Sequence, residues 1–206
     1  MKILIATNNE KKLNEFKRIL KSLDISAQSA LECGITLDDV EETGSTFLEN
    51  AFLKANAACR KTGMAAIADD SGLCVDALNG APGIFSARYG GKTSSAEEKT
   101  QKLLNEMCNI PQKDRTAHFE CAICCVFPNG DRIETIQTCY GYIAKKQLGS
   151  GGFGYDPIFL YDNTNRSFAE MSADEKDSVS HRGKALHEFR KKLLSYIGDN
   201  LTVNNS

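Results

Sequence analysis

The sequence predicts an α/β protein built on a mixed β-sheet, and two observations support this fold class. Short apolar runs of strand type alternate with segments in which apolar residues recur at helical spacing. In the middle of the chain, two strand-like segments, 118–127 and 133–144, follow each other with only Pro128-Asn129-Gly130-Asp131 at the turn. This pattern indicates an antiparallel hairpin and not a helical crossover, so the sheet should contain both strand directions.

The first third of the chain reads as strand, helix, helix, strand. Residues 2–6, KILIA, form a short apolar strand. The next segment, LNEFKRILKSL, has the spacing of an amphipathic helix at Leu13, Phe16, Ile19, Leu20 and Leu23. Thr46-x-x-Glu49 is a capping-box pattern that begins a second helix, and Gly63 suits its C-terminal cap. Residues 65–68 then predict a short buried strand that leads into DDSGL.

The remaining elements follow from the same kinds of signal. Ser95-x-x-Glu98 is a second capping-box pattern and predicts a helix that reaches about Met107. After the hairpin come a glycine-rich loop and a strand over 157–161. The segment EKDSVSHRGKAL reads as a loop leading into the last helix, which we expect from about residue 181 to 197. Gly198 should end that helix and leave a frayed tail over 199–206.

Composition narrows the class of protein. A chain of 206 residues with 41% hydrophobic and 25% charged residues is typical of one globular domain. Its net charge of -2 argues against general affinity for nucleic-acid backbones, although a local basic pocket remains compatible with it. The N-terminal apolar run is too short for a signal peptide, and no segment approaches the roughly 18–20 apolar residues of a membrane span. We therefore expect a cytoplasmic protein.

Eight cysteines raise the question of a metal site or of disulfides. The cluster CAICC places Cys121 and Cys125 on one face of a strand and Cys124 on the other. A zinc site would need a matching second pair at C-x-x-C spacing, which the sequence does not contain. The cysteines lie mostly in apolar, periodic contexts, so we favour reduced thiols in the core.

The hexapeptide GSGGFG at 149–154 matches the G-x-G-x-x-G pattern of dinucleotide-binding turns. Such a turn should open a helix whose N-terminus holds the pyrophosphate. Here Tyr155-Asp156-Pro157 follows, and proline restricts its predecessor to extended conformations. The context therefore argues against a nicotinamide-dependent oxidoreductase. The loop is either a flexible surface loop or a place where the backbone approaches a ligand closely.

A possible phosphate site lies between the first strand and the first helix, at Thr7-Asn8-Asn9-Glu10-Lys11-Lys12. Backbone N–H groups at a helix N-terminus and the helix dipole favour an anion there. The short donors of threonine and asparagine and the charge of Lys12 add to this tendency. A plain capped turn would have the same sequence, and this segment alone does not decide between them.

Two pairs of adjacent carboxylates suggest a metal site. Asp69-Asp70 follows the short buried strand, and Glu41-Glu42 lies in a loop. Mg²⁺ prefers hard oxygen ligands, often one or two carboxylates together with substrate phosphates, and one residue from each pair would meet that need. Strand alternation sends the two aspartates different ways, and the sequence does not tell which one faces the metal. A helix cap or an Asx turn is the structural alternative for DDSG.

Further polar side chains could bind a nucleotide. Asn50 and Lys54 share one helix face, from which Lys54 could reach a phosphate; a solvated polar face is the alternative. Lys176, His181 and Arg182 offer several donors, which suit a keto oxygen on a purine and disfavour an amino group there. The alternative for these three is surface charge with a capped helix.

Taken together, the motifs resemble those of the inosine/xanthosine triphosphate pyrophosphatase family, over residues 2 to about 197. The segments that carry the resemblance occur in this order: Thr7-Asn8-Asn9…Lys12, Phe47-x-Glu49-Asn50-Ala51…Lys54-Ala55, Ala68-Asp69-Asp70-Ser71-Gly72-Leu73, Ala81-Pro82-Gly83…Ser86-Ala87-Arg88-Tyr89, Gly151-Gly152-Phe153-Gly154-Tyr155-Asp156-Pro157-Ile158-Phe159, Ala169-Glu170-Met171 and Ser180-His181-Arg182-Gly183-Lys184-Ala185-Leu186. Two departures are minor: Asn8 stands where glycine is common, and cysteines fill several apolar positions.

The resemblance implies an elongated mixed sheet flanked by helices, two lobes with a central substrate cleft, and a homodimer. It implies Mg²⁺-dependent hydrolysis of ITP, dITP and XTP to the monophosphate and pyrophosphate. The implied triphosphate ligands are Thr7, Asn8, Asn9, Glu10, Lys11, Lys12 and Lys54. Glu41 and Asp70 are the implied metal ligands, with Asp70 also the general base, and Ser71 touches the substrate. The implied base and sugar pocket contains Phe153, Gly154, Tyr155 and Asp156, with Lys176, His181 and Arg182 at the 6-keto edge.

Two other interpretations remain open at this point. One is a related pyrophosphatase for pyrimidine or modified nucleotides, against which the Ser180-His181-Arg182 segment argues. The other is a non-catalytic nucleotide-binding protein of the same fold. Retention of Asp70, Glu41 and Lys54 argues against it, because binding alone does not require a carboxylate base.

Overall fold

The computed structural model describes residues 2–203, apart from 23, 38, 39, 92 and 163, with side chains described up to 199. Leu23 and the tail residues 204–206 therefore lie outside the described residues. Within that range the helices are α1 (Glu10–Ser22), α2 (Phe47–Thr62), α3 (Ala96–Glu106), α4 (Ala173–Val179) and α5 (His181–Val203). The strands are β1 (Lys2–Ile5), β2 (Ser26–Ser29), β3 (Ala66–Val75), β4 (Thr116–Val126), β5 (Arg132–Ile143) and β6 (Phe159–Tyr161).

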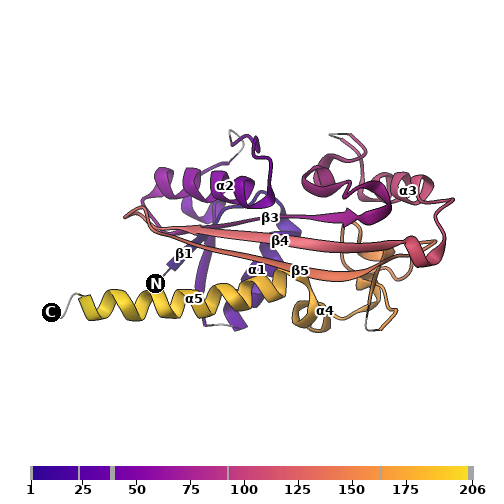
Figure 1. Ribbon diagram of the computed structural model, residues 1–206. Helices are drawn as coiled ribbons and strands as arrows, with labels where there is room; N and C mark the ends of the chain where they lie inside the picture. Colours follow the sequence, from indigo (N-terminus) through magenta and orange to yellow (C-terminus); the bar gives the residue numbers. More distant parts are fainter. Residues whose placement is uncertain (1, 23, 38–39, 92, 163, 204–206) are drawn as a thin grey trace. The chain divides into compact units, whose positions relative to one another are not determined.

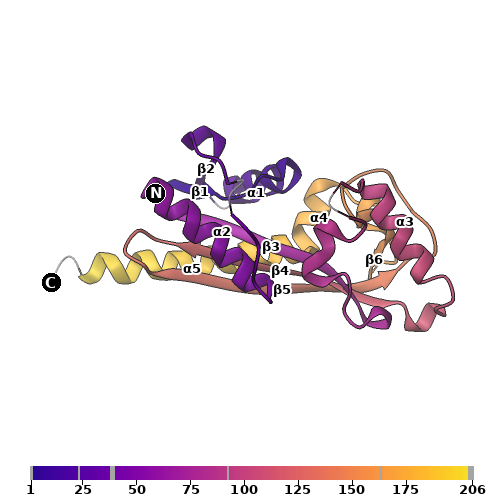
Figure 2. The same ribbon diagram turned by 90° about the horizontal axis from the view of Figure 1, so that it is seen from above.

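The strands within the described range form one six-stranded sheet in the order β2-β1-β3-β4-β5-β6, and these strands are labelled in Figures 1 and 2. β1 pairs parallel with both β2 and β3, whereas β5 pairs antiparallel with β6. β4 and β5 are neighbours joined by the predicted turn, in which the Phe127 N–H donates to the Asp131 carbonyl at 2.9 Å. The prediction of an α/β fold with a mixed sheet and a central hairpin is therefore confirmed.

The chain divides into two compact units. Unit 1 comprises Met1–Asp70, Ala122–Gln137 and Gly183–Ser206, and unit 2 comprises Ser71–Cys121 and Thr138–Arg182. β3, β4 and β5 each contribute residues to both units, and the first boundary falls at the Asp70–Ser71 peptide bond. A substrate cleft between two lobes stays a prediction.

The core of unit 1 packs α2 closely against the strands. Ala51, Ala55 and Ala58 recur at helical spacing and are fully buried, in one cluster with Leu4 and Ala66. Because alanine adds almost no side chain, the helix axis can approach the sheet closely enough for longer side chains on α2 to reach it. In Figure 1, α5 covers the face of these strands opposite to α2, and Figure 2 shows α1 beside β1 and β2.

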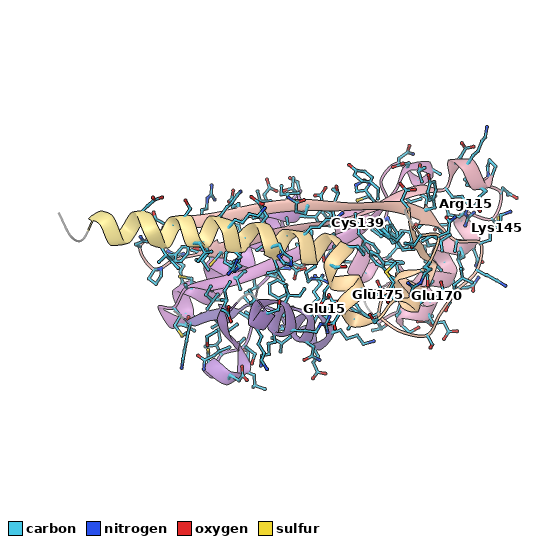
Figure 3. The ribbon with its side chains drawn as sticks, turned by 90° about the horizontal axis from the view of Figure 1, so that it is seen from below. Glu15, Arg115, Cys139, Lys145, Glu170 and Glu175 are labelled. Atoms are coloured by element: carbon cyan, nitrogen blue, oxygen red, sulfur yellow. The ribbon has the colours of Figure 1, made fainter. Side chains whose placement is uncertain are left out.

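The core of unit 2 is aromatic. Phe119, Phe159 and Phe168 are buried together, with ring centroids 4.7–5.9 Å apart. At the edge of this core the buried Arg115, labelled in Figure 3, donates to the carbonyl groups of Ile143 and Ala144 and of residues just after α3. These bonds connect the chain after α3 to the end of β5 and so fix the frame that carries the glycine-rich loop.

The predicted helix caps are present. Thr46 and Ser95 each accept a bond from the backbone three residues on, and each capping box is closed by its glutamate. Gly63 ends α2 with a φ of 66°. The sequence did not predict the short parallel strand β2, nor α4. The latter begins with a further capping box, Ser172 with Glu175.

Three predicted boundaries were wrong. β3 does not stop at residue 68 but continues through both aspartates to Val75, because Leu73 and Val75 extend the buried face. Pro157 and Ile158 belong to a 3-10 turn, so β6 begins only at Phe159. α5 passes through Gly198 and is helical up to Val203, the last described residue, and Gly198 lacks the positive φ that a glycine cap requires.

Candidate functional site

Unit 1 contains a cluster of carboxylates and lysines around the middle of β3. Lys12, near the start of α1, lies 3.1 Å from the Asp69 carboxylate. Lys54, on α2, lies 3.6 Å from Asp70 and 2.6 Å from Glu42. Their charges compensate the two aspartates, which are only 1% and 7% exposed, and this compensation allows ionisable residues inside a buried strand.

The two aspartates have different neighbours, as the predicted alternation requires. Asp69 is paired with Lys12 from α1, whereas Asp70 contacts two residues of α2. Those two residues are Lys54 and Asn50, whose side-chain amide donates to Asp70 Oδ2 at 3.1 Å. The polar face of α2 is therefore directed toward Asp70 and is not a solvated surface.

The structure brings Glu42, not the predicted Glu41, to this cluster. Glu42 binds Lys54, whereas the side chain of Glu41 is exposed. The sequence pattern leaves both members of the Glu41-Glu42 pair open, because in an irregular loop no periodicity tells which neighbour turns inward, and only the resemblance implies Glu41. Asn50 is a further residue of this cluster that is absent from the predicted site, although its spacing predicts that it shares a helix face with Lys54.

The electrostatics of the cluster favour an active carboxylate. Burial raises the pKa of Asp70, and the nearby Glu42 and Asp69 carboxylates add to this effect, while Lys54 and Lys12 oppose it in part. Burial disfavours the charge on Lys54, but the neighbouring carboxylates, Asp70 first, outweigh it and hold the Lys54 pKa above its usual value. Asp70 is thus a better proton acceptor than an exposed aspartate, beside a lysine that stays cationic.

The predicted phosphate loop is a capped helix start in this structure. The Asn9 side chain accepts from the backbone N–H groups of Lys11 and Lys12 at 3.0 and 3.1 Å, and the Asn9 N–H donates to Thr7. Asn8 and Glu10 are exposed beside this turn. The turn thus has the capped geometry of the plainer alternative, while Lys12 still extends into the carboxylate cluster.

Oxygen ligands suitable for a divalent cation are present in unit 1. The described residues contain no group of three or more histidine, cysteine or acidic side chains arranged to hold a metal. Glu42 and Asp70, however, both reach Lys54 and offer two carboxylates. Mg²⁺ is commonly held by one or two carboxylates with substrate phosphates completing the shell, so this donor set fits Mg²⁺.

Unit 2 carries the predicted donor set. Lys176, on α4, donates to the buried Asp156 at 2.7 Å, and the same carboxylate oxygen accepts from the Phe153 N–H at 2.7 Å. The Lys176 ammonium lies 4.6 Å from the centre of the Phe153 ring, and the Arg182 guanidinium lies 5.9 Å from it. Arg182 also donates to Ser71 at 2.8 Å. These side chains therefore surround one aromatic ring with cationic donors.

The segment predicted as a loop around Lys176 is in fact helical. Lys176 lies on α4, and His181 is the first residue of α5. Glu170 and Glu175, labelled in Figure 3, close two successive capping boxes before and at the start of α4. The His181 ring stacks on Phe119, with centroids 4.6 Å apart and planes 8° apart. Lys176 and His181 thus both lie on helices.

The glycine-rich loop has the geometry of a tight turn around Asp156. Gly152 has a φ of 68°, and a Cβ there would meet the Asp156 side chain, at 2.9 Å from its Cβ. Gly154 also has a positive φ. The loop leads into a 3-10 turn and β6, not into a long helix, as the sequence predicted. The buried Tyr155 hydroxyl donates to the carbonyl of Ser86 at 3.0 Å, which connects the loop to the segment around Ser86.

The cysteines pack as apolar residues. All eight are free, and five of them are buried. Burial raises the pKa of the Cys124 thiol to about 12 and raises that of Cys125 as well. Thiols that resist ionisation are poor nucleophiles, which agrees with a role in packing.

The model of the Ham1 family matches residues 3–192. This chain belongs to the Ham1 family. It is 43% identical to a dITP/XTP pyrophosphatase of Bacillus cereus over 197 residues, which cover 95% of the chain and 96% of that relative. A dITP/XTP pyrophosphatase of Halalkalibacterium halodurans is 44% identical, covering 92% of the chain and 97% of the relative.

Solved structures show the same fold. The Ham1 protein of Staphylococcus aureus is 43% identical, with a TM-score of 0.84, 95% of this chain covered and 100% of that one. A nucleoside-triphosphatase, also described as a dITP/XTP pyrophosphatase, of Mycobacterium abscessus is 42% identical, with a TM-score of 0.74 and coverage of 91% and 98%. None of the described helices combines the length and the apolar character that crossing a membrane requires.

Proposed function

We propose that this chain hydrolyses the non-standard purine nucleotides ITP, dITP and XTP to the monophosphate and pyrophosphate, and so removes them from the nucleotide pool. Relatives at 43–44% identity over nearly the whole chain are dITP/XTP pyrophosphatases. The observation that carries the proposal is the buried Asp70, whose pKa is raised and which lies beside the cationic Lys54. A binding protein would not need such a carboxylate.

In the proposed reaction, water attacks the α-phosphorus and the bond to the pyrophosphate breaks. Asp70 accepts the proton of the attacking water. Lys12 and Lys54 stabilise the negative charge that develops on the leaving pyrophosphate, and residues Thr7 to Lys11 contact the triphosphate beside them. Positioning and electrostatics of this kind supply most of the acceleration in phosphoryl transfer.

Mg²⁺ is the proposed cofactor. Asp70 and a glutamate of the 41–42 pair would hold it, and Glu42 is the member of that pair that the fold directs toward Asp70. When bound, the cation would neutralise phosphate charge and polarise the phosphoryl oxygens. Asn50 and Lys54 would keep the carboxylates oriented before the cation arrives.

Selectivity for the base is proposed to come from unit 2. The Phe153 ring would stack on the purine, within the loop that Gly154, Tyr155 and Asp156 complete. Lys176, His181 and Arg182 would donate to the 6-keto oxygen, and Ser71 would contact the substrate. Adenine presents an amino group at that position, which would leave buried donors unpaired at a loss of about 1–3 kcal/mol each.

We further propose that the protein is a cytoplasmic homodimer. It binds a small-molecule nucleotide and not nucleic acid. The net charge of -2 supports the last point, and the resemblance supports the others.

The decisive test is pyrophosphate release from ITP, XTP, GTP, ATP and dTTP in the presence of Mg²⁺, with the monophosphate identified as co-product. We expect fast release from ITP and XTP and very slow release from ATP. Tight binding of ITP without turnover on any nucleotide would favour the non-catalytic alternative. Preferential turnover of dTTP would instead assign the chain to other nucleotides. Repeating the assay with a chelator tests the Mg²⁺ requirement.

A further inference from the structure

Asn50 is the most completely buried polar side chain beside the proposed reaction centre. It lies in the first turn of α2 and is 0% exposed. Its Nδ2 donates to Asp70 at 3.1 Å, and its Oδ1 accepts from the backbone N–H of Gly44 at 2.8 Å. Both ends of the amide therefore contact segments that carry proposed metal and catalytic residues: β3 on one side, and the loop containing Glu42 on the other.

The chemistry of the two contacts fixes the orientation of the Asn50 amide. The Gly44 N–H can only donate, and an ionised Asp70 can only accept, so rotating the amide by half a turn would break both bonds. Gly44 fits closely against this residue, since a Cβ there would lie 2.8 Å from Asn50 Oδ1 and 2.6 Å from Glu49 Cβ. The loop and the amide thus constrain each other.

The same helix face continues to Lys54, one turn further along α2. Lys54 contacts both Glu42 and Asp70, as Asn50 contacts the Glu42 loop and Asp70. Two residues four apart therefore connect the acidic loop to β3 twice, once through the uncharged Asn50 amide and once through the charged Lys54 ammonium. Lys54 offsets part of the carboxylate charge, whereas the hydrogen bonds of the Asn50 amide are directional and can set the angle of Asp70.

We infer that Asn50 is a positioning residue: it holds the Asp70 carboxylate and the Glu42 loop in the relative geometry that the reaction requires. This inference rests on the proposed function, because it assigns to Asn50 a role in the same reaction. It predicts that substitutions at this contact reduce kcat far more than they change KM.

Two variants separate the role of Asn50 from folding. Asn50→Asp keeps an acceptor for the Gly44 N–H but replaces the donor to Asp70 with a like charge. Gly44→Ala does not change the residue at position 50, but the added Cβ would lie 2.8 Å from Asn50 Oδ1 and would force this oxygen to move. Thr135→Val is the matched control, because Thr135 is also buried in unit 1 and donates one bond, to the Ala185 carbonyl at 3.2 Å.

The measurements are kcat and KM for ITP, the stoichiometry of ITP binding by calorimetry in the presence of a chelator, and hydrogen exchange of the segment around Gly44. For Asn50→Asp and Gly44→Ala we expect kcat to fall by about 10- to 100-fold, the size of a misplacement of roughly 1 Å. KM should stay within about 3-fold, and binding should remain near one ITP per chain, which shows that the chains are folded. Thr135→Val should retain the wild-type kcat.

Hydrogen exchange gives a readout that does not depend on turnover. The Gly44 amide should stay protected in Asn50→Asp, where an acceptor remains, and should lose protection in Gly44→Ala. A kcat within about 2-fold of wild type in both variants would overturn the inference, as would an equal loss in Thr135→Val. Absence of turnover in the wild-type protein would instead contradict the proposed function itself, so the two failures are distinguishable.

Discussion

At the scale of single residues, burial of Asp70 lowers the stability of the folded chain and makes its carboxylate more basic. An aspartate inside a β-strand would normally be a poor choice, and burial raises its pKa. The fold tolerates it because Lys54 and Asn50 contact it from α2. Because burial raises the pKa of Asp70, its ionised carboxylate is a stronger base than that of an exposed aspartate, which favours proton transfer from water.

Asp70→Asn should therefore lower turnover strongly and raise stability. Turnover should fall by at least ~10²-fold, since a general base contributes ~10²–10⁴-fold to the rate, while ITP binding persists.

The same variant should be more stable than the wild type at neutral pH. The pKa of Asp70 in the folded chain lies above its usual value of 3.8, so the folded state loses stability as pH rises from 3.8 through the raised pKa. A neutral asparagine avoids this loss. Thermal unfolding without Mg²⁺ or nucleotide should show the variant more stable at pH 7, with the difference shrinking toward pH 3.8. A less stable variant at pH 7 would contradict the sign of the pKa shift.

The sequence could identify Asp70 and Lys54 as site candidates but not their immediate neighbours. A strand alternates strictly, so two adjacent aspartates had to face different ways, and they do. A loop has no such rule, so the residues alone leave Glu41 and Glu42 open; the resemblance implies Glu41, whereas in the structure Glu42 contacts Lys54. The spacing of Asn50 places it on the same helix face as Lys54, but spacing alone does not show that its amide contacts Asp70 and Gly44.

At the scale of elements, local signals predicted most of the fold, and tertiary contacts decided the rest. Capping boxes located the starts of α2 and α3, since their hydrogen bonds are local. The predicted length of β3 is too short, because the strand continues past two charges that partners distant in sequence, Lys12 and Lys54 among them, make tolerable. β2 has few strand-forming residues and exists through its pairing with β1.

The glycine-rich loop offers a matched pair of substitutions. Gly152 and Gly63 have nearly the same φ, 68° and 66°, but a Cβ at Gly152 would collide with Asp156, whereas one at Gly63 would meet nothing within 4 Å. Gly63→Ala should cost about 1 kcal/mol of unfolding free energy for the backbone conformation alone. Gly152→Ala should cost about 1–3 kcal/mol more and should raise KM for ITP, because it displaces the carboxylate that holds Lys176. Equal losses in urea unfolding would show that the Asp156 contact does not matter.

The end of α5 can be tested in the same way. Gly198 was expected to cap this helix, but the helix continues to Val203, and a Cβ at Gly198 would meet nothing within 4 Å. Gly198→Ala should therefore stabilise the protein by about 0.5–1 kcal/mol, the usual gain inside a helix. If residue 198 were a left-handed cap in solution, the same substitution would destabilise it by a similar amount. Thermal or urea unfolding gives the sign directly.

At the scale of the whole molecule, the proposed tasks separate along the two units. Unit 1 holds the carboxylates and lysines around Asp70, and unit 2 holds the donors around Phe153. The two sets are joined in sequence at the Asp70–Ser71 bond, within β3. This division follows from chemistry: the phosphates are common to every nucleotide, whereas the base alone distinguishes ITP from ATP. Residues of unit 1 should therefore affect all nucleotides alike.

Paired lysine variants test this division. Lys54→Met should lower kcat/KM for ITP and ATP by the same factor, because Lys54 is proposed to act on phosphates that both nucleotides carry. Lys176→Met should lower kcat/KM for ITP by about 10- to 100-fold and leave the slow reaction of ATP nearly unchanged, since a lost hydrogen bond from a charged donor is worth about 1.5–3 kcal/mol. The measurement is the ratio of kcat/KM for the two nucleotides in each variant. A ratio that changes in Lys54→Met, or that stays constant in Lys176→Met, would contradict the proposed separation.

Because Lys176 is buried against Asp156, its variant should first be shown to melt within a few degrees of wild type. A selectivity change in a folded Lys176→Met protein would then place base recognition on the α4 donor that the 2.7 Å contact with Asp156 holds over Phe153.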